Sequence, residues 1–148
     1  MSIWKDARIP VAVALLAWGC GMAENAVFEP KPIVGMSEAP AGEDSKKLDA
    51  ELTAFLRNKH AIASARYYRV PADIAWMALT KSVQNQMAEK SIQRIMFDWF
   101  EPGLDLVEMY PQGKSGAGFA LAMPKGTNPK ADKLVGFYVL GAPAGTKK

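Results

Sequence analysis

Two stretches of the chain repeat apolar residues at the spacing of an amphipathic helix. The first begins near Asp44 and Ser45, either of which can cap a helix by accepting a backbone N–H. Its apolar stripe consists of Leu48, Leu52, Phe55 and Leu56. The second spans about 72–89, and its stripe consists of Trp76, Leu79, Val83 and Met87. Both stretches are therefore predicted to be helices with one buried face.

Most of the remaining pattern has a period of two, which is typical of strands. The candidate strands are 63–70, 91–100, 104–110, 117–123 and 134–140. Turns rich in Gly and Pro separate the last four, which favours an antiparallel meander, and the last is apolar on both faces, as a central strand would be. The order predicts an α+β two-layer sandwich, with two helices packed on one face of a mostly antiparallel sheet of about five strands.

The N-terminus has the pattern of an export signal. Lys5 and Arg8 precede the uncharged run 9–19, which is too short to span a membrane, since spanning takes about 20 apolar residues. Small residues at Gly21 and Ala23 suit cleavage by signal peptidase before residue 24. The chain is thus predicted to divide into a signal segment 1–23, a Pro-rich tether 24–43 and a single α+β domain 44–148.

Cys20 follows the apolar run directly, with Gly19 before it. This arrangement resembles the lipobox of bacterial lipoproteins, in which the cysteine is acylated and becomes the mature N-terminus. The usual pattern has a branched aliphatic residue and a small residue where this chain has Ala17 and Trp18. Two cleavages therefore stay open, and the lipoprotein alternative predicts a periplasmic protein anchored to the membrane through Cys20.

Composition excludes several classes of protein. With 148 residues, 49% of them hydrophobic, the chain is globular and not disordered. One Cys and one His exclude a disulfide scaffold and any metal site rich in Cys or His, so no metal and no cofactor is expected. The net charge of +3 and the pI near 9.0 could suit nucleic acid, but export argues against such a partner.

Few residues offer catalytic chemistry. His60 could be a general base or a metal ligand, but no other His and no nearby Cys can join it as a ligand, and it lies near a helix end, where a cation suits the helix dipole. The acidic residues of 98–108 could contain the acid/base pair of a small cell-wall hydrolase. These are Asp98, Glu101, Asp105 and Glu108. We interpret them as a solvated face and assign no catalytic residue.

The aromatic residues point to binding. Tyr67 and Tyr68 are adjacent in a predicted strand, as are Trp99 and Phe100, so one member of each pair should face away from the helices. Exposed aromatic side chains beside arginines have the composition of a protein interface. The candidate partner-binding residues are Tyr67, Tyr68, Trp99, Phe100, Arg66, Arg69 and Arg94.

These features predict a non-enzymatic cell-envelope protein that acts as a protein-interaction module, and an inhibitor or immunity-type protein belongs to the same class. Its partner would be another envelope protein, bound through the aromatic face of the sheet or an exposed strand edge. A cell-wall hydrolase and a carrier of a small apolar ligand are the alternatives. The sequence leaves the oligomeric state open.

Overall fold

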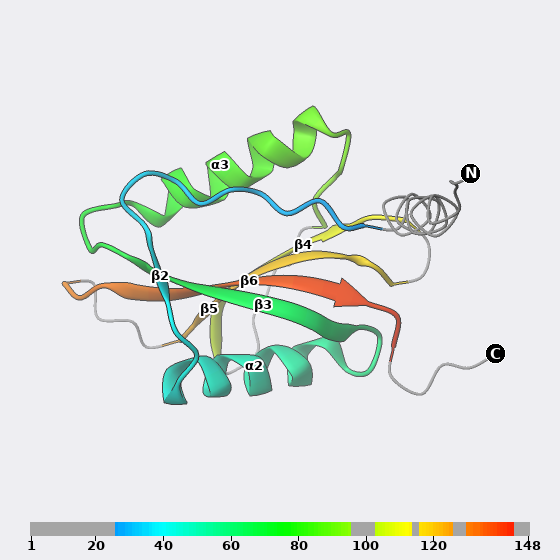
Figure 1. The fold of residues 1–148 in the computed structure, drawn as a ribbon, viewed down its shortest axis with the longest axis horizontal. Helices are drawn as coiled ribbons and strands as arrows, with labels where there is room; N and C mark the ends of the chain where they lie inside the picture. Colours follow the sequence, from blue (N-terminus) through cyan, green and yellow to red (C-terminus); the bar gives the residue numbers. More distant parts are fainter. Residues whose placement is uncertain (1–25, 96–102, 114–115, 126–129, 144–148) are drawn as a thin grey trace, which may run out of the picture.

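The protein is described by a computed structural model that covers residues 26–95, 103–113, 116–125 and 130–143 (Figure 1). The signal segment predicted for residues 1–23 lies outside the described residues. The described elements are β2 (Ser37–Ala39), α2 (Glu43–Leu56), β3 (Ala61–Val70), α3 (Trp76–Glu89), β4 (Leu104–Pro111), β5 (Gly118–Pro124) and β6 (Lys133–Gly141). The predicted α+β class is confirmed, since two helices pack against a five-stranded sheet.

The strands form one antiparallel sheet in the order β2-β3-β6-β5-β4. Strands β4, β5 and β6 follow each other as the predicted meander. Strand β6 is the central strand, as its two apolar faces predict, because it pairs with β5 on one side and with β3 on the other. The three-residue strand β2 extends the sheet beside β3, with Glu38 opposite Tyr68.

The two helices lie on opposite faces of the sheet (Figure 1). Helix α2 packs on strand residues that include Tyr67 and Tyr138, whereas α3 packs on residues that include Tyr68 and Phe137. Neighbouring strand residues point to opposite faces, so a sheet that is apolar on both faces needs a cover on each. Each face of the sheet thus carries one of the two helices. The expectation that both helices share one face is wrong.

Helix α3 begins later than its apolar pattern suggests. Residues 71–75 form a turn in which the Ile74 N–H donates to the Pro71 carbonyl, and the helix starts at Trp76. Leu79, Val83 and Met87 are buried as expected, whereas Trp76 is 37% exposed. Helix α2 agrees closely with its predicted range, and its three leucines are buried.

The segment predicted to be a tether is packed on the domain. Residues 26–36, which we call the strap, run along α3 before the chain enters β2 (Figure 1). Phe28 and Ile33 pack against the core on the α3 face, whereas Val34 is 97% exposed. The strap therefore completes the cover on that face.

The predicted strand 91–100 is only partly described. Ile95 forms an isolated antiparallel bridge with Met109 of β4, whereas residues 91–94 are irregular. Residues 96–100 lie outside the described part of the chain. No helix in the described ranges is long and apolar enough to cross a membrane.

Candidate functional site

A buried ion pair lies at the β4 edge of the sheet, on the α3 face. The Arg94 guanidinium donates from Nη1 to Glu108 Oε2 at 2.8 Å, and the Tyr110 hydroxyl donates to Glu108 Oε1 at 2.9 Å. The side chains of Arg94 and Glu108 are only 22% and 9% exposed. Both carboxylate oxygens are thus engaged, as burial of a charge requires. Burial, followed by the charge of Glu108, raises the pKa of Tyr110.

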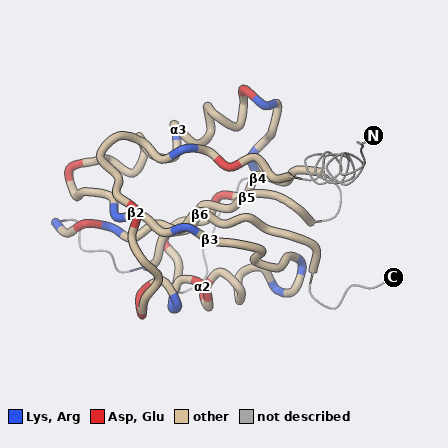
Figure 2. The backbone as a smooth tube through the Cα atoms, in the orientation of Figure 1, with Lys and Arg blue, Asp and Glu red and all other residues tan. Residues whose placement is uncertain are grey.

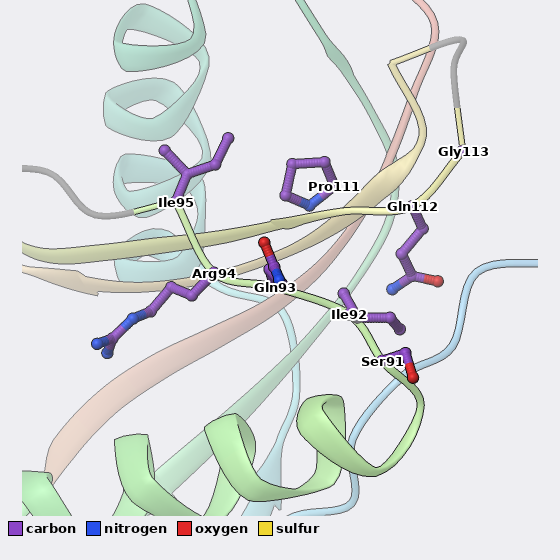
Figure 3. A pocket seen from close by; sticks show the side chains of 8 residues that line it. All are labelled: Ser91, Ile92, Gln93, Arg94, Ile95, Pro111, Gln112 and Gly113. Carbon is purple, nitrogen blue, oxygen red and sulfur yellow. The ribbon is translucent and has the colours of Figure 1, made fainter.

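This pair holds Arg94 beside a groove that we call the Arg94 groove (Figure 3). Two short segments form its walls, one after α3 and one at the end of β4. Its lining residues are Ser91, Ile92, Gln93, Arg94, Ile95, Pro111, Gln112 and Gly113, and its volume is about 570 Å³. The Arg94 guanidinium points away from the other lining side chains, and the Gln112 side chain points toward the strap.

Pro111 explains why the groove exists. Antiparallel pairing of Ile95 with Met109 would bring Gln93 opposite Pro111 in the next equivalent pair. Proline has no N–H to donate to the Gln93 carbonyl, so the ladder cannot continue through this position. Among the described residues, no backbone hydrogen bond joins Gln93 to Pro111. The segment 91–94 therefore separates from β4 and leaves a wedge between them.

The lining of the groove combines amide, apolar and main-chain groups. Ile95 is 44% exposed at one end, and Gln93 is exposed between the two walls. A second hollow adjoins the Arg94 groove. It lies between segment 91–94 and α3, and Gln84 and Ala88 form part of its wall. Open, shallow hollows with main-chain groups suit an extended peptide, whereas small-molecule sites usually enclose most of the ligand.

Neither Tyr67 nor Tyr68 is exposed, so the prediction that one of the two faces away from the helices is wrong. Both are buried, at 9% and 6% exposed, because each face of the sheet has its own helix. The Tyr67 hydroxyl donates to the Asp49 carboxylate at 2.8 Å, as does that of Tyr138, so Asp49 anchors the middle of α2 to the sheet. Burial, followed by the hydrogen bond to Asp49, raises the pKa of Tyr67 to about 12.

The three candidate arginines do not form one patch. Arg66 is exposed, and its pKa is raised by its hydrogen bond to Tyr68 and then by the charge of Glu29 in the strap. The Nη2 atom of Arg69 lies 3.9 Å from Oδ2 of Asp44 at the start of α2. Arg94 is the member of the set that lies at the groove. Figure 2 shows Lys and Arg positions mixed with Asp and Glu positions around the described chain.

Three further predicted residues lie outside the described residues. They are Trp99, Phe100 and Cys20. A role of Trp99 and Phe100 in binding, and lipidation of Cys20, stay predictions.

The catalytic alternatives gain no support from the described carboxylates. Glu108 is buried and held by Arg94 and Tyr110, so its interpretation as part of a solvated face is wrong. Asp105 is exposed as expected and is the extra residue of a bulge between Leu104 and Leu106. Asp98 and Glu101 lie outside the described part of the chain. Within the described ranges, no group of three or more Asp, Glu, His or Cys could hold a metal ion.

His60 has a hydrogen-bond partner from a distant part of the chain. Its Nδ1 lies 2.8 Å from the carbonyl oxygen of Gly116, and this contact ties the start of β3 to the turn before β5. A hydrogen bond to a main-chain carbonyl positions the ring without supplying a carboxylate that could orient a general base.

The residues that sequence reasoning missed are two glutamines. Gln86 of α3 and Gln112 each hold the backbone of one strap residue through their amide groups. The signal was present in the strap, where the apolar residues Val27, Pro30 and Ile33 recur every third residue. That is the period of a polyproline II helix, and a search limited to periods of 2 and 3.6 passes over it.

Comparisons with known proteins were made at three levels. No protein-family model, no curated protein and no solved structure matches this chain.

Proposed function

We propose that the chain is an exported, non-enzymatic protein of the bacterial cell envelope, whose domain binds an extended segment of another envelope protein in the Arg94 groove. The observation that supports this most directly is the interrupted pairing at Pro111. An incoming extended segment can use the main-chain groups of Gln93 that β4 leaves unpaired, which is a form of strand addition.

The buried ion pair favours a preformed site. Arg94 is fixed by Glu108 at 2.8 Å, so the segment that carries Gln93 keeps its separation from β4. A site that is already ordered pays less conformational entropy when the partner binds. An inhibitor or immunity-type protein would use such a site in the same way.

Export and anchoring are the second part of the proposal. The basic residues before the uncharged run 9–19 support export, and the position of Cys20 supports a lipid anchor. An anchored domain meets envelope partners at a raised effective concentration, so modest affinity is sufficient.

Site-specific photo-crosslinking in cells tests the groove. A photoreactive side chain at Gln93 should give a discrete adduct with one envelope protein. The same side chain at Lys47, which is exposed on α2 on the other face, is the matched control. No adduct from Gln93, or the same adducts from both positions, would contradict the proposal.

Intact-mass measurement of protein from its native envelope tests export and anchoring. We expect a mature chain that starts at Cys20 and carries acyl groups, and Cys20→Ala should then release the protein from membranes. A mass that includes residues 1–19 would contradict export. A mass that starts at Glu24 would keep export and remove the anchor.

A further inference from the structure

The strap is held in the manner of a bound peptide. Phe28 donates its N–H to Gln112 Oε1 at 2.7 Å, and Gln112 Nε2 donates to the Phe28 carbonyl at 3.0 Å. Lys31 makes the same pair of bonds with Gln86, at 2.8 and 3.0 Å. Each glutamine amide thus replaces a neighbouring strand, since it offers one donor and one acceptor to the backbone.

The two bonded residues lie three apart, which is one turn of a polyproline II helix. The same period governs burial along the strap. The inward residues at this spacing are Val27, Pro30, Ile33 and Met36, and Phe28 beside Val27 also packs against the core. Glu29 and Pro32 are exposed between them. Because no backbone–backbone hydrogen bond forms within residues 26–32, the N–H and C=O groups of this described stretch remain available to the glutamines.

The strap depends on side chains for its place. Between residues 26 and 33, no backbone–backbone hydrogen bond joins it to another segment in the described part of the chain. By contrast, β2 is paired with β3 through the sheet. The strap can therefore leave its site while the five-stranded sheet keeps its pairing.

Charge and ring contacts add selectivity. The Lys90 ammonium lies 5.3 Å from the centroid of the Phe28 ring, within the range of a cation–π contact. After the hydrogen bond to Tyr68, the charge of Glu29 raises the pKa of Arg66, and Glu29 is the residue before the buried Pro30. These contacts favour a ligand with an aromatic residue, an acidic residue and a proline in succession.

We propose that the surface under the strap, which includes Gln86, Lys90 and Gln112, is a binding site for an extended, proline-containing segment of a partner protein with an acidic residue before its proline. The strap occupies this site in cis, and the partner segment replaces it. The proposal rests on the proposed function only in that the ligand belongs to another protein, because the Arg94 groove is a neighbouring surface that meets this one at Gln112. A partner segment that replaces the strap keeps the apolar core covered, whereas departure of the strap alone would expose it.

A peptide with the strap sequence tests the site. The probe is a fluorescent synthetic peptide of residues 26–36, and the control peptide carries Asp in place of Pro30. A linked strap competes at a millimolar effective concentration, so the probe should bind the wild-type protein weakly. It should bind the Pro30→Asp protein at least about ten-fold more tightly, because the weakened strap competes less. The control peptide should bind neither protein.

Hydrogen exchange on the wild-type protein gives a second readout that needs no variant. The amides of Phe28 and Lys31 donate to glutamine oxygens, so a saturating probe should accelerate their exchange. The amides of α2, on the other face, should not respond. Unchanged exchange at Phe28 and Lys31, or equal probe affinity for wild-type and folded Pro30→Asp protein, would overturn the proposal. A Gln93 crosslink that survives this result would leave the proposed function intact.

Discussion

The two faces of the sheet are covered in different ways. On one face α2 is sufficient, and Asp49 fixes its middle to Tyr67 and Tyr138. On the other face α3 leaves part of the core uncovered, and the strap covers it together with Ile74 and Ile92. The α2 face is thus closed by one internal helix, whereas the α3 face is completed by a segment attached through side chains.

This difference locates the part of the molecule that can change its contacts. A helix between two connected strands can leave the sheet only if the domain opens. An extended segment without backbone pairing can leave at lower cost, as binding elements commonly do. The strap and the Arg94 groove both lie on the α3 face, and both proposals concern that face.

The largest expected effect comes from the cores of the two faces. Leu52→Ala on the α2 face and Leu79→Ala on the α3 face should each lower the free energy of unfolding by about 2–5 kcal/mol, because both side chains are fully buried. Denaturation followed by fluorescence and by circular dichroism should show one transition in both variants. A midpoint unchanged by Leu79→Ala, or two separate transitions, would mean that the faces do not share one cooperative core.

Replacing the two anchoring carboxylates compares the faces more finely. Glu108→Gln removes the charge that Arg94 faces and should cost about 2 kcal/mol. Asp49→Asn keeps an acceptor for the tyrosine hydroxyls and should cost about 1 kcal/mol. Urea denaturation at neutral pH measures both.

The matched control for these two variants is Asp105→Asn, which changes an exposed carboxylate on β4 and should stay within about 0.5 kcal/mol. If Asp49→Asn lowers the free energy of unfolding more than Glu108→Gln does, the negative charge of Asp49 stabilises the fold more than its ability to accept hydrogen bonds does.

Alkaline pH should weaken the anchor on the α2 face. An unfolded tyrosine ionises near pH 10, whereas the pKa of folded Tyr67 is about 12. The folded state thus binds the proton more tightly, so this contribution to stability is complete below pH 10 and is lost as pH rises toward 12. Unfolding midpoints between pH 9 and 12 measure it, and Tyr67→Phe should make the decline shallower. An unchanged decline in Tyr67→Phe would contradict the assignment.

The smallest change in stability is expected at the groove. Pro111→Val supplies an N–H that can donate to the Gln93 carbonyl, so segment 91–95 should pair further along β4. Stability should change by less than about 1 kcal/mol, since the site is at an edge and one hydrogen bond is gained. The new amide at position 111 should be protected from hydrogen exchange, and crosslinking from Gln93 should fall. Full crosslinking together with a protected amide would show that the wedge is not the binding site.

Local pattern was a good guide to the elements but a poor guide to their contacts. The stripes at Leu48 and Leu79 predicted both helices because an apolar period of about 3.6 is set within one segment. The exposure of Tyr67 and Tyr68 could not be predicted in the same way, because it depends on where a distant helix lies. The groove depends on the meeting of Gln93 with Pro111, which are 18 positions apart in the chain.

By itself, the sequence determined the α+β class, the ranges of most elements and the central position of β6, since these follow from local periodicity and from turns. Only the tertiary structure decided which face each helix covers, that Glu108 is buried against Arg94, and that the strap lies on the core. The physical reason is that burial and pairing are properties of two surfaces at once. A residue's own neighbours in the chain specify only one of those surfaces.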